Sequence, residues 1–259
     1  MSLPAVLAGL EARSDGFALS IPTDWHQGRT AYGGFSAALA LAAAMRVGGE
    51  LPPLRSAQVS FVGPLAGDVV VSARKLRAGR NATWFAAEIA GEGGVGLLAS
   101  FVFMGPVPSA LHINDRPPPS GLIAPDDAQA VPTELSPIFL RSHFDVRFAV
   151  PRSAEKEPEL CWWVRLCERE GIDHMIGLLA CADGLPPGVL PLLDARSPVS
   201  SMTWQCNLLT PEPRTRDGWW LLRSHGDYAE NGCSSQTMEI WNTDGAPIMA
   251  GMQSVAVFG

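Results

Sequence analysis

One segment of the chain is apolar or small at almost every position. It covers residues 30–45 (TAYGGFSAALALAAAM) and has an arginine on each side. A helix on a protein surface is apolar on one stripe only, so a helix of this composition is expected to be surrounded by other structure. The pattern therefore predicts a buried central helix.

After this segment the pattern changes to that of strands. Stretches rich in β-branched and aromatic residues are separated by Gly, Pro and Asn turn signals. They cover residues 55–62, 68–77, 82–90 and 95–104. Residues 91–96 fit G-x-G-x-x-G, but a strand pattern follows them instead of the helix that dinucleotide binding requires, which favours a hairpin turn. One buried helix followed by a strand meander predicts a sheet wrapped around a helix.

The same order returns in the second half. A strand-like segment, residues 159–167, precedes an apolar helical segment, residues 174–182. Further strand-like segments follow at residues 199–209, 219–224, 234–241 and 247–258.

A fixed offset relates the last three strands of the two halves. It is 151 positions between Gly67 and Gly218, and again 151 between Ile89 and Ile240. An offset held over about forty positions predicts a duplicated fold.

A proline-rich segment separates the two halves. Residues 105–140 contain eight prolines, and such a segment is stiff, extended and poor in core-forming residues. We expect residues 1–105 and 141–259 to form the two repeats and residues 106–140 to link them.

Composition narrows the class of protein. With 26 acidic and 19 basic residues the net charge is −7, which argues against nucleic acid as a partner. Five cysteines without paired spacing are typical of reduced thiols in a cytoplasmic protein, and the histidines show no metal-ligand spacing. The longest apolar helical run is shorter than the roughly 20 residues that cross a bilayer, so we expect no membrane span.

Two polar residues stand out from apolar surroundings. Asp183 ends the helical segment 174–182, where the negative end of the helix gives a carboxylate no stabilisation. A functional role would explain it, and an exposed position in a turn is the alternative. Gln253 lies in the final strand, where the offset of 151 aligns it with Val102, so one copy carries an amide and the other an apolar residue. An outward-facing glutamine is the alternative here.

The order of three short motifs resembles the type II acyl-CoA thioesterases, the TesB-like proteins. They are Tyr32-Gly33-Gly34 before a small-residue helix, Ala182-Asp183-Gly184 after the second helix, and Met252-Gln253 near the end. The resemblance extends from about residue 16 to residue 258. It implies an α+β double hotdog, in which two repeats, each a helix wrapped by an antiparallel sheet, form a pseudo-dimer. It also implies a homodimer.

The resemblance further implies hydrolysis of an acyl-CoA thioester by water, without a covalent intermediate, metal or other cofactor. The family uses an Asp, a Ser or Thr, and a Gln, and Asp183 and Gln253 match the first and third. The hydroxyl position falls on Pro198, Val199 or Ser200, of which we choose Ser200.

The remaining part of the implied site is the start of the first helix. Backbone N–H groups near Gly34 and Phe35 would bind the developing oxyanion, and Gly33 and Gly34 would permit close approach of the substrate thioester to that backbone. Two other functions use the same scaffold. One is a binding protein for acyl-CoA or an acyl carrier that has lost turnover. The other is a hydratase or dehydratase, which needs an Asp and a His at one site, with His26 or His174 as the candidates.

Overall fold

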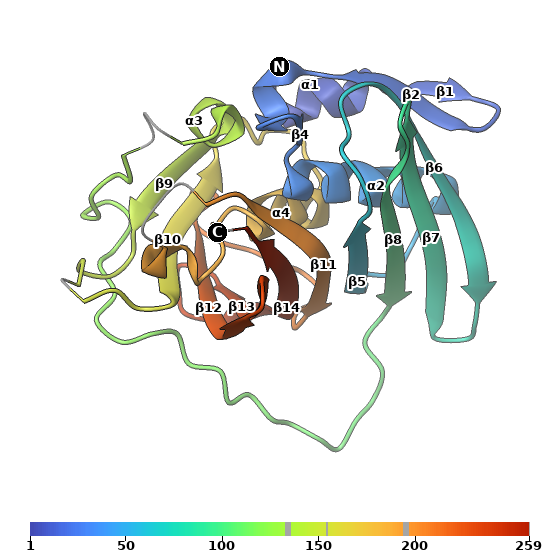
Figure 1. Cartoon of the computed structure of the whole chain (residues 1–259). Helices are drawn as coiled ribbons and strands as arrows, with labels where there is room; N and C mark the ends of the chain where they lie inside the picture. Colours follow the sequence, from blue (N-terminus) through green and yellow to red (C-terminus); the bar gives the residue numbers. More distant parts are fainter. Residues whose placement is uncertain (133–135, 154, 194–196, 259) are drawn as a thin grey trace.

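Twelve strands join into one antiparallel sheet in a computed structural model, which describes residues 1–132, 136–153, 155–193 and 197–258 (Figure 1). The first half contains α1 (Leu3–Ala8), β1 (Glu11–Arg13), β2 (Gly16–Ile21), η1 (Thr23–Trp25), β3 (His26–Gln27), β4 (Thr30–Ala31), α2 (Gly33–Gly48), β5 (Leu54–Phe61), β6 (Gly67–Ala78), β7 (Ala82–Gly91) and β8 (Gly94–Met104). The second half contains α3 (Ile138–His143), β9 (Phe144–Phe148), β10 (Glu159–Leu166), α4 (His174–Ala182), η2 (Leu190–Leu192), β11 (Val199–Leu208), β12 (Trp220–Glu230), β13 (Cys233–Trp241) and β14 (Pro247–Val257).

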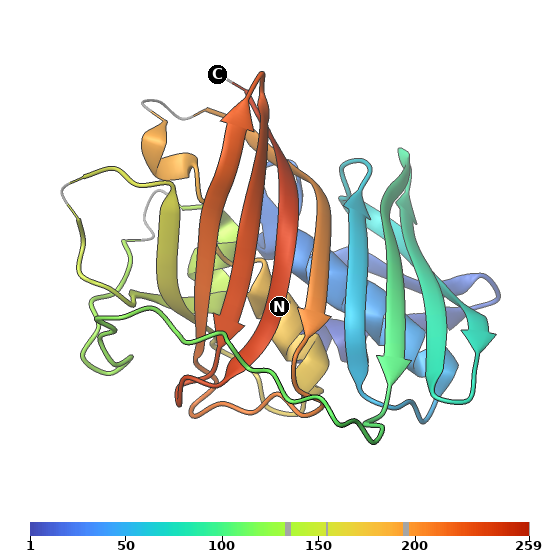
Figure 2. The same cartoon turned by 90° about the horizontal axis from the view of Figure 1, so that it is seen from below.

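The two halves contribute equally to this sheet. Its order is β1-β2-β6-β7-β8-β5-β11-β14-β13-β12-β10-β9, so each half supplies six strands and β5 pairs with β11 at the centre. The helices α2 and α4 pack against each other on one face of the sheet (Figure 2). The junction between the halves is therefore both a strand pair and a helix pair.

The predicted buried helix is confirmed as α2. Every residue from 34 to 44 is buried, because the sheet of the first half covers one side of the helix and α4 another. The helix begins at Gly33 and not at Thr30, since residues 30–31 pair with residues 26–27 as strands β4 and β3. Of the helices in the described ranges, none has the length and apolar character needed to span a membrane.

The duplication is visible in the strand register. Val71 lies opposite Ile89 in the first half, and Leu222 lies opposite Ile240 in the second, which keeps the offset at 151. The β-bulges in these two strand pairs are also 151 positions apart. Residues 92 and 93 form the turn between β7 and β8, so the segment 91–96 is part of a hairpin, as its sequence predicts.

The last strand departs from this offset. Gln236 lies opposite Gln253, and Phe85 lies opposite Phe101. Phe85 and Gln236 are 151 positions apart in the sequence, whereas Phe101 and Gln253 are 152 positions apart. The reason is that the β13–β14 hairpin is one residue longer than the β7–β8 hairpin. The alignment of Gln253 with Val102 is therefore wrong by one residue. Its structural counterpart is Phe101, a buried core residue, so Gln253 faces inward.

The proline-rich segment covers the outer face of the second half. Leu122, Ile123 and Ala128 pack there in a small apolar cluster with residues such as Trp163 and Trp241. The indole of Trp163 donates to the Ile123 carbonyl at 2.8 Å. In Figure 2 the segment crosses the sheet on the side opposite the helices. It is a packed cover as well as a link between the halves.

Candidate active site

Asp183 lies where α4 meets the start of α2. The helix α4 is capped by Asp173, whose carboxylate accepts from the Met175 and Ile176 N–H groups at 2.8 and 3.3 Å, and it ends directly before Asp183. A Cβ placed on Gly33 would lie 2.5 Å from Asp183 Oδ2. The carboxylate thus occupies the space that a side chain at position 33 would fill.

The start of α2 supplies the backbone N–H donors that the carboxyl end of α4 lacks. The first hydrogen bond within α2 runs from the Ser36 N–H to the Tyr32 carbonyl at 3.0 Å, so the N–H groups of Gly33, Gly34 and Phe35 have no acceptor inside the helix. The Gly34 N–H donates to the Asp183 carboxylate. A carboxylate at the negative end of one helix is therefore stabilised by the positive end of a helix from the other half.

Gln253 holds the other side of the carboxylate. Its Nε2 donates to Asp183 Oδ1 at 2.9 Å, and its Oε1 accepts from Gln236 Nε2 at 2.9 Å. Gln236 Oε1 in turn accepts from the Gly188 N–H at 2.9 Å. Both glutamine side chains are buried, with exposed fractions of 4% for Gln253 and 0% for Gln236. A chain of three hydrogen bonds thus ends on Asp183.

Burial raises the pKa of Asp183 to about 7, while the hydrogen bonds from Gln253 and Gly34 lower it. Two other titratable groups interact with this carboxylate, Tyr32 and Cys206, and burial raises the pKa of each well above its ordinary value. Both therefore remain neutral in the range where Asp183 titrates. As a whole residue Asp183 is only partly buried.

Close packing fixes the distance between the two helices at this point. The Tyr32 hydroxyl donates to the Ala180 carbonyl at 2.9 Å. A Cβ on Gly34 would lie 2.6 Å from that hydroxyl oxygen and 2.7 Å from the Ala180 carbonyl oxygen. The Phe35 side chain points into the core, where it stacks on Trp25 with 4.6 Å between the ring centroids. Only the backbone of Phe35 is therefore available to the site.

The structure does not bring Ser200 to Asp183 and Gln253. The side chains of Trp204 and Gln253 are opposite each other and buried, and strict alternation would place Ser200 on the same face. A β-bulge between Ser201 and Thr203 reverses the alternation. Ser201 lies opposite the buried Val255 and takes the inner face, whereas Ser200 is exposed.

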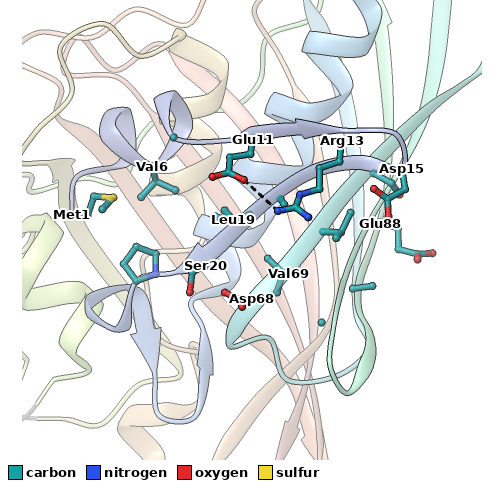
Figure 3. A pocket seen from close by; sticks show the side chains of 17 residues that line it. Met1, Val6, Glu11, Arg13, Asp15, Leu19, Ser20, Asp68, Val69 and Glu88 are labelled. Carbon is teal, nitrogen blue, oxygen red and sulfur yellow. Dashed lines mark hydrogen bonds and ion pairs between the residues drawn. The ribbon is translucent and has the colours of Figure 1, made fainter.

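Two hollows lie away from this site. One of about 880 Å³ is formed by α1 and strands β1, β2, β6 and β7, and Glu11 and Arg13 form an ion pair at its edge (Figure 3). The other, of about 450 Å³, lies where α2 ends and α4 begins. Neither is lined by Asp183, Gln253 or Gly34. The candidate site is identified by the side chains and hydrogen bonds around Asp183 and not by the volume of a cavity.

No group of three or more His, Cys, Asp or Glu side chains could hold a metal ion in the ranges that the structure covers. At the junction the Asp183 carboxylate meets the Gln253 carboxamide and the start of α2.

Two helix-in-sheet repeats that share a continuous sheet define the class: the protein is a double hotdog. The model of the acyl-CoA thioesterase C-terminal domain matches residues 117–257, and that of the acyl-CoA thioesterase N-terminal domain matches residues 21–104. The chain belongs to the acyl-CoA thioesterase family, a family of thioester hydrolases.

Solved structures agree on the fold. A hot dog fold protein of unknown function from Alicyclobacillus acidocaldarius has a TM-score of 0.85 and 20% identity, with 98% of this chain and 97% of that chain covered. For acyl-CoA thioesterase II TesB2 from Mycobacterium marinum the TM-score is 0.78 and the identity 18%, with 100% and 99% covered. For the tesB protein of Mycobacterium avium subs paratuberculosis the values are 0.79 and 16%, with 100% of both chains covered. No curated protein matches the sequence.

Proposed function

We propose that this protein hydrolyses acyl-CoA by direct attack of a water molecule, with Asp183 as the general base. The proposal rests on the pKa and the hydrogen-bond partners of Asp183. Its pKa of about 7 lets the carboxylate accept a proton at neutral pH, and Gln253 and the start of α2 hold it in place. The homodimer that the resemblance implies remains a prediction.

In the proposed reaction one proton passes from water to Asp183 and then to the leaving group. Asp183 takes a proton from water while the water oxygen forms a bond to the thioester carbonyl carbon. The carbonyl electrons move to its oxygen, and when they return the C–S bond breaks. The proton on Asp183 then passes to the leaving CoA sulfur. The products are a carboxylic acid and free CoA, and Asp183 is again ionised.

The negative charge on the carbonyl oxygen needs donors that are already in place. The N–H groups of Gly33 and Phe35 have no acceptor within α2, and they lie at the positive end of the helix. The Gly34 N–H is used by Asp183. We therefore assign oxyanion binding to Gly33 and Phe35, and the positioning of the base to Gly34.

Gln253 has a second donor to offer. Its Nε2 carries two hydrogens, and one of them is directed at Asp183. The other can bind the attacking water and orient its lone pair. Ser200, which the sequence suggests for this task, lies on the outer face of β11.

The geometry does not support His174 as the partner of Asp183 in a hydratase. His174 is the first residue of α4 and Asp183 follows the last, which places them about 13 Å apart along the helix. A binding protein without turnover remains the second candidate, since an acyl-CoA site could be retained on this scaffold after hydrolysis is lost.

We expect the purified protein to release free CoA from at least one member of a panel of acyl-CoAs of increasing chain length. The measurement is thiol release with a chromogenic disulfide reagent, with Asp183→Asn as the matched control. Tight binding across the panel with no thiol release would establish the binding protein instead. Hydration of an enoyl-CoA with the thioester intact would establish the hydratase.

A further inference from the structure

The buried pair Gln236–Gln253 has an aromatic counterpart in the first half. The positions that correspond to them in strands β7 and β8 are Phe85 and Phe101, which lie opposite each other and are both fully buried. The fold is therefore compatible with an apolar pair at this place. Two buried carboxamides are costly unless all their polar atoms are hydrogen-bonded, so a role beyond packing is indicated.

The hydrogen bonds determine which way the side-chain amides of Gln236 and Gln253 are oriented. The Gly188 N–H can only donate, so Gln236 must turn its Oε1 toward Gly188 and its Nε2 toward Gln253. Gln253 then turns its Oε1 toward Gln236 and its Nε2 toward Asp183. The backbone of a glycine five residues after Asp183 thus determines which end of the Gln253 amide faces the carboxylate.

We infer that Gln236 is a positioning residue, which acts through Gln253 by holding its amide with the Nε2 directed at Asp183. The inference rests on the proposed function, since it gives Gln236 a part in preparing the general base. Without Gln236, only the hydrogen bond to Asp183 itself orients the Gln253 amide, and when Asp183 is protonated the amide can turn to accept from the carboxyl O–H. That orientation stabilises the protonated form of Asp183, and both the base and the water lose a donor.

Loss of the Gln253 hydrogen bond changes the pKa of Asp183 in a definite direction. The hydrogen bond from Gln253 lowers the pKa of Asp183, so its loss moves that pKa above about 7. Tyr32 and Cys206, the other titratable groups that interact with the carboxylate, are neutral in this range and do not mask the change. A residue that only stabilised the fold would change the melting temperature and leave the pKa of Asp183 where it is.

Gln236→Met and Gln236→Glu test this assignment in the full-length protein. Methionine keeps the length of the side chain and removes its polar ends. Glutamate keeps the shape, but when ionised it accepts from both neighbours and so turns the Gln253 amide around. The control is Ser235→Ala, a change at the next position of β13, which faces the other side of the sheet.

We expect kcat to fall by about 10- to 100-fold in Gln236→Met, with little change in KM, and further in Gln236→Glu. Both variants should raise the pH at which Asp183 ionises by about one unit, read by infrared spectroscopy of the protein with isotope-labelled aspartate against Asp183→Asn. An unchanged ionisation of Asp183 in both variants would overturn the inference. The spectroscopic reading needs no turnover. A wild-type protein without activity would therefore refute the proposed function, while the role of Gln236 would still be decided.

Discussion

Asp183→Asn is expected to lower kcat for acyl-CoA hydrolysis by about a thousandfold or more, because an amide cannot accept the proton of the attacking water. The substitution changes almost nothing in size. Gln253 Nε2 can still donate to the asparagine Oδ1, so the geometry of the junction is expected to persist. Loss of activity in a folded protein would then report the chemistry of the carboxylate.

The same variant should be more stable than the wild type at alkaline pH. The pKa of Asp183 is about 7 in the folded protein and near 3.8 in the unfolded chain, so the folded state binds this proton more tightly. Folding stability therefore decreases as the pH rises from about 4 to about 7. Asp183→Asn removes this titration, and we expect it to gain on the order of 2 kcal/mol at pH 8, with the advantage smaller at pH 5 and lost near pH 4.

Thermal unfolding at pH 5 and pH 8 measures this difference, with Asp126→Asn as an exposed control. The role of Asp183 would be refuted by an Asn variant that retains full activity. A stability difference that does not change with pH would contradict the raised pKa.

Gly34→Ala is expected to lower both the stability and the activity of the protein. The added Cβ would lie 2.7 Å from the Ala180 carbonyl oxygen, which belongs to the backbone of α4, and 2.6 Å from the Tyr32 hydroxyl oxygen. The two helices must therefore separate, which we expect to cost about 1–3 kcal/mol of stability. The Gly34 N–H and Asp183 would move apart with them, and kcat should fall about 100-fold.

Gly93→Ala is the matched control for this change. A Cβ at that position has no heavy atom within 4 Å, so the variant should retain the stability and activity of the wild type. Melting temperature and kcat of the two variants are compared under the same conditions. Equal behaviour of the two alanine variants would show that close approach of α2 and α4 at Gly34 is unimportant.

Most of the elements could be predicted because their signals are local. The apolar runs of α2 and α4 and the strands after them are bounded by Gly, Pro and Asn, and most observed boundaries differ from the predicted ones by three residues or fewer. The exception is β12, which continues six residues beyond its predicted end at residue 224. The short elements β1, β2, β3, β4, β9 and α3 were not predicted. Each has six residues or fewer, and their position depends on the neighbours against which they pack.

The site could be predicted only in part. Asp183 and Gln253 stand out because each is polar in an apolar context. The position of Ser200 depends on a β-bulge, and the counterpart of Gln253 depends on the length of a hairpin, neither of which alternation reveals. Gln236 carried a usable signal, since the offset of 151 aligns it with Phe85. A second amide in place of a core aromatic could have been noticed from the sequence.

The proposed hydrolysis depends above all on a carboxylate that ionises near neutral pH and removes a proton from water. The most direct test is the pH dependence of kcat/KM between pH 5 and pH 9, with an acyl-pantetheine thioester that has no titrating phosphate. We predict that log kcat/KM rises with a slope of one and levels off above an apparent pKa of about 7, the pKa of Asp183. A rate that is independent of pH over this range would contradict the assignment of Asp183 as the general base.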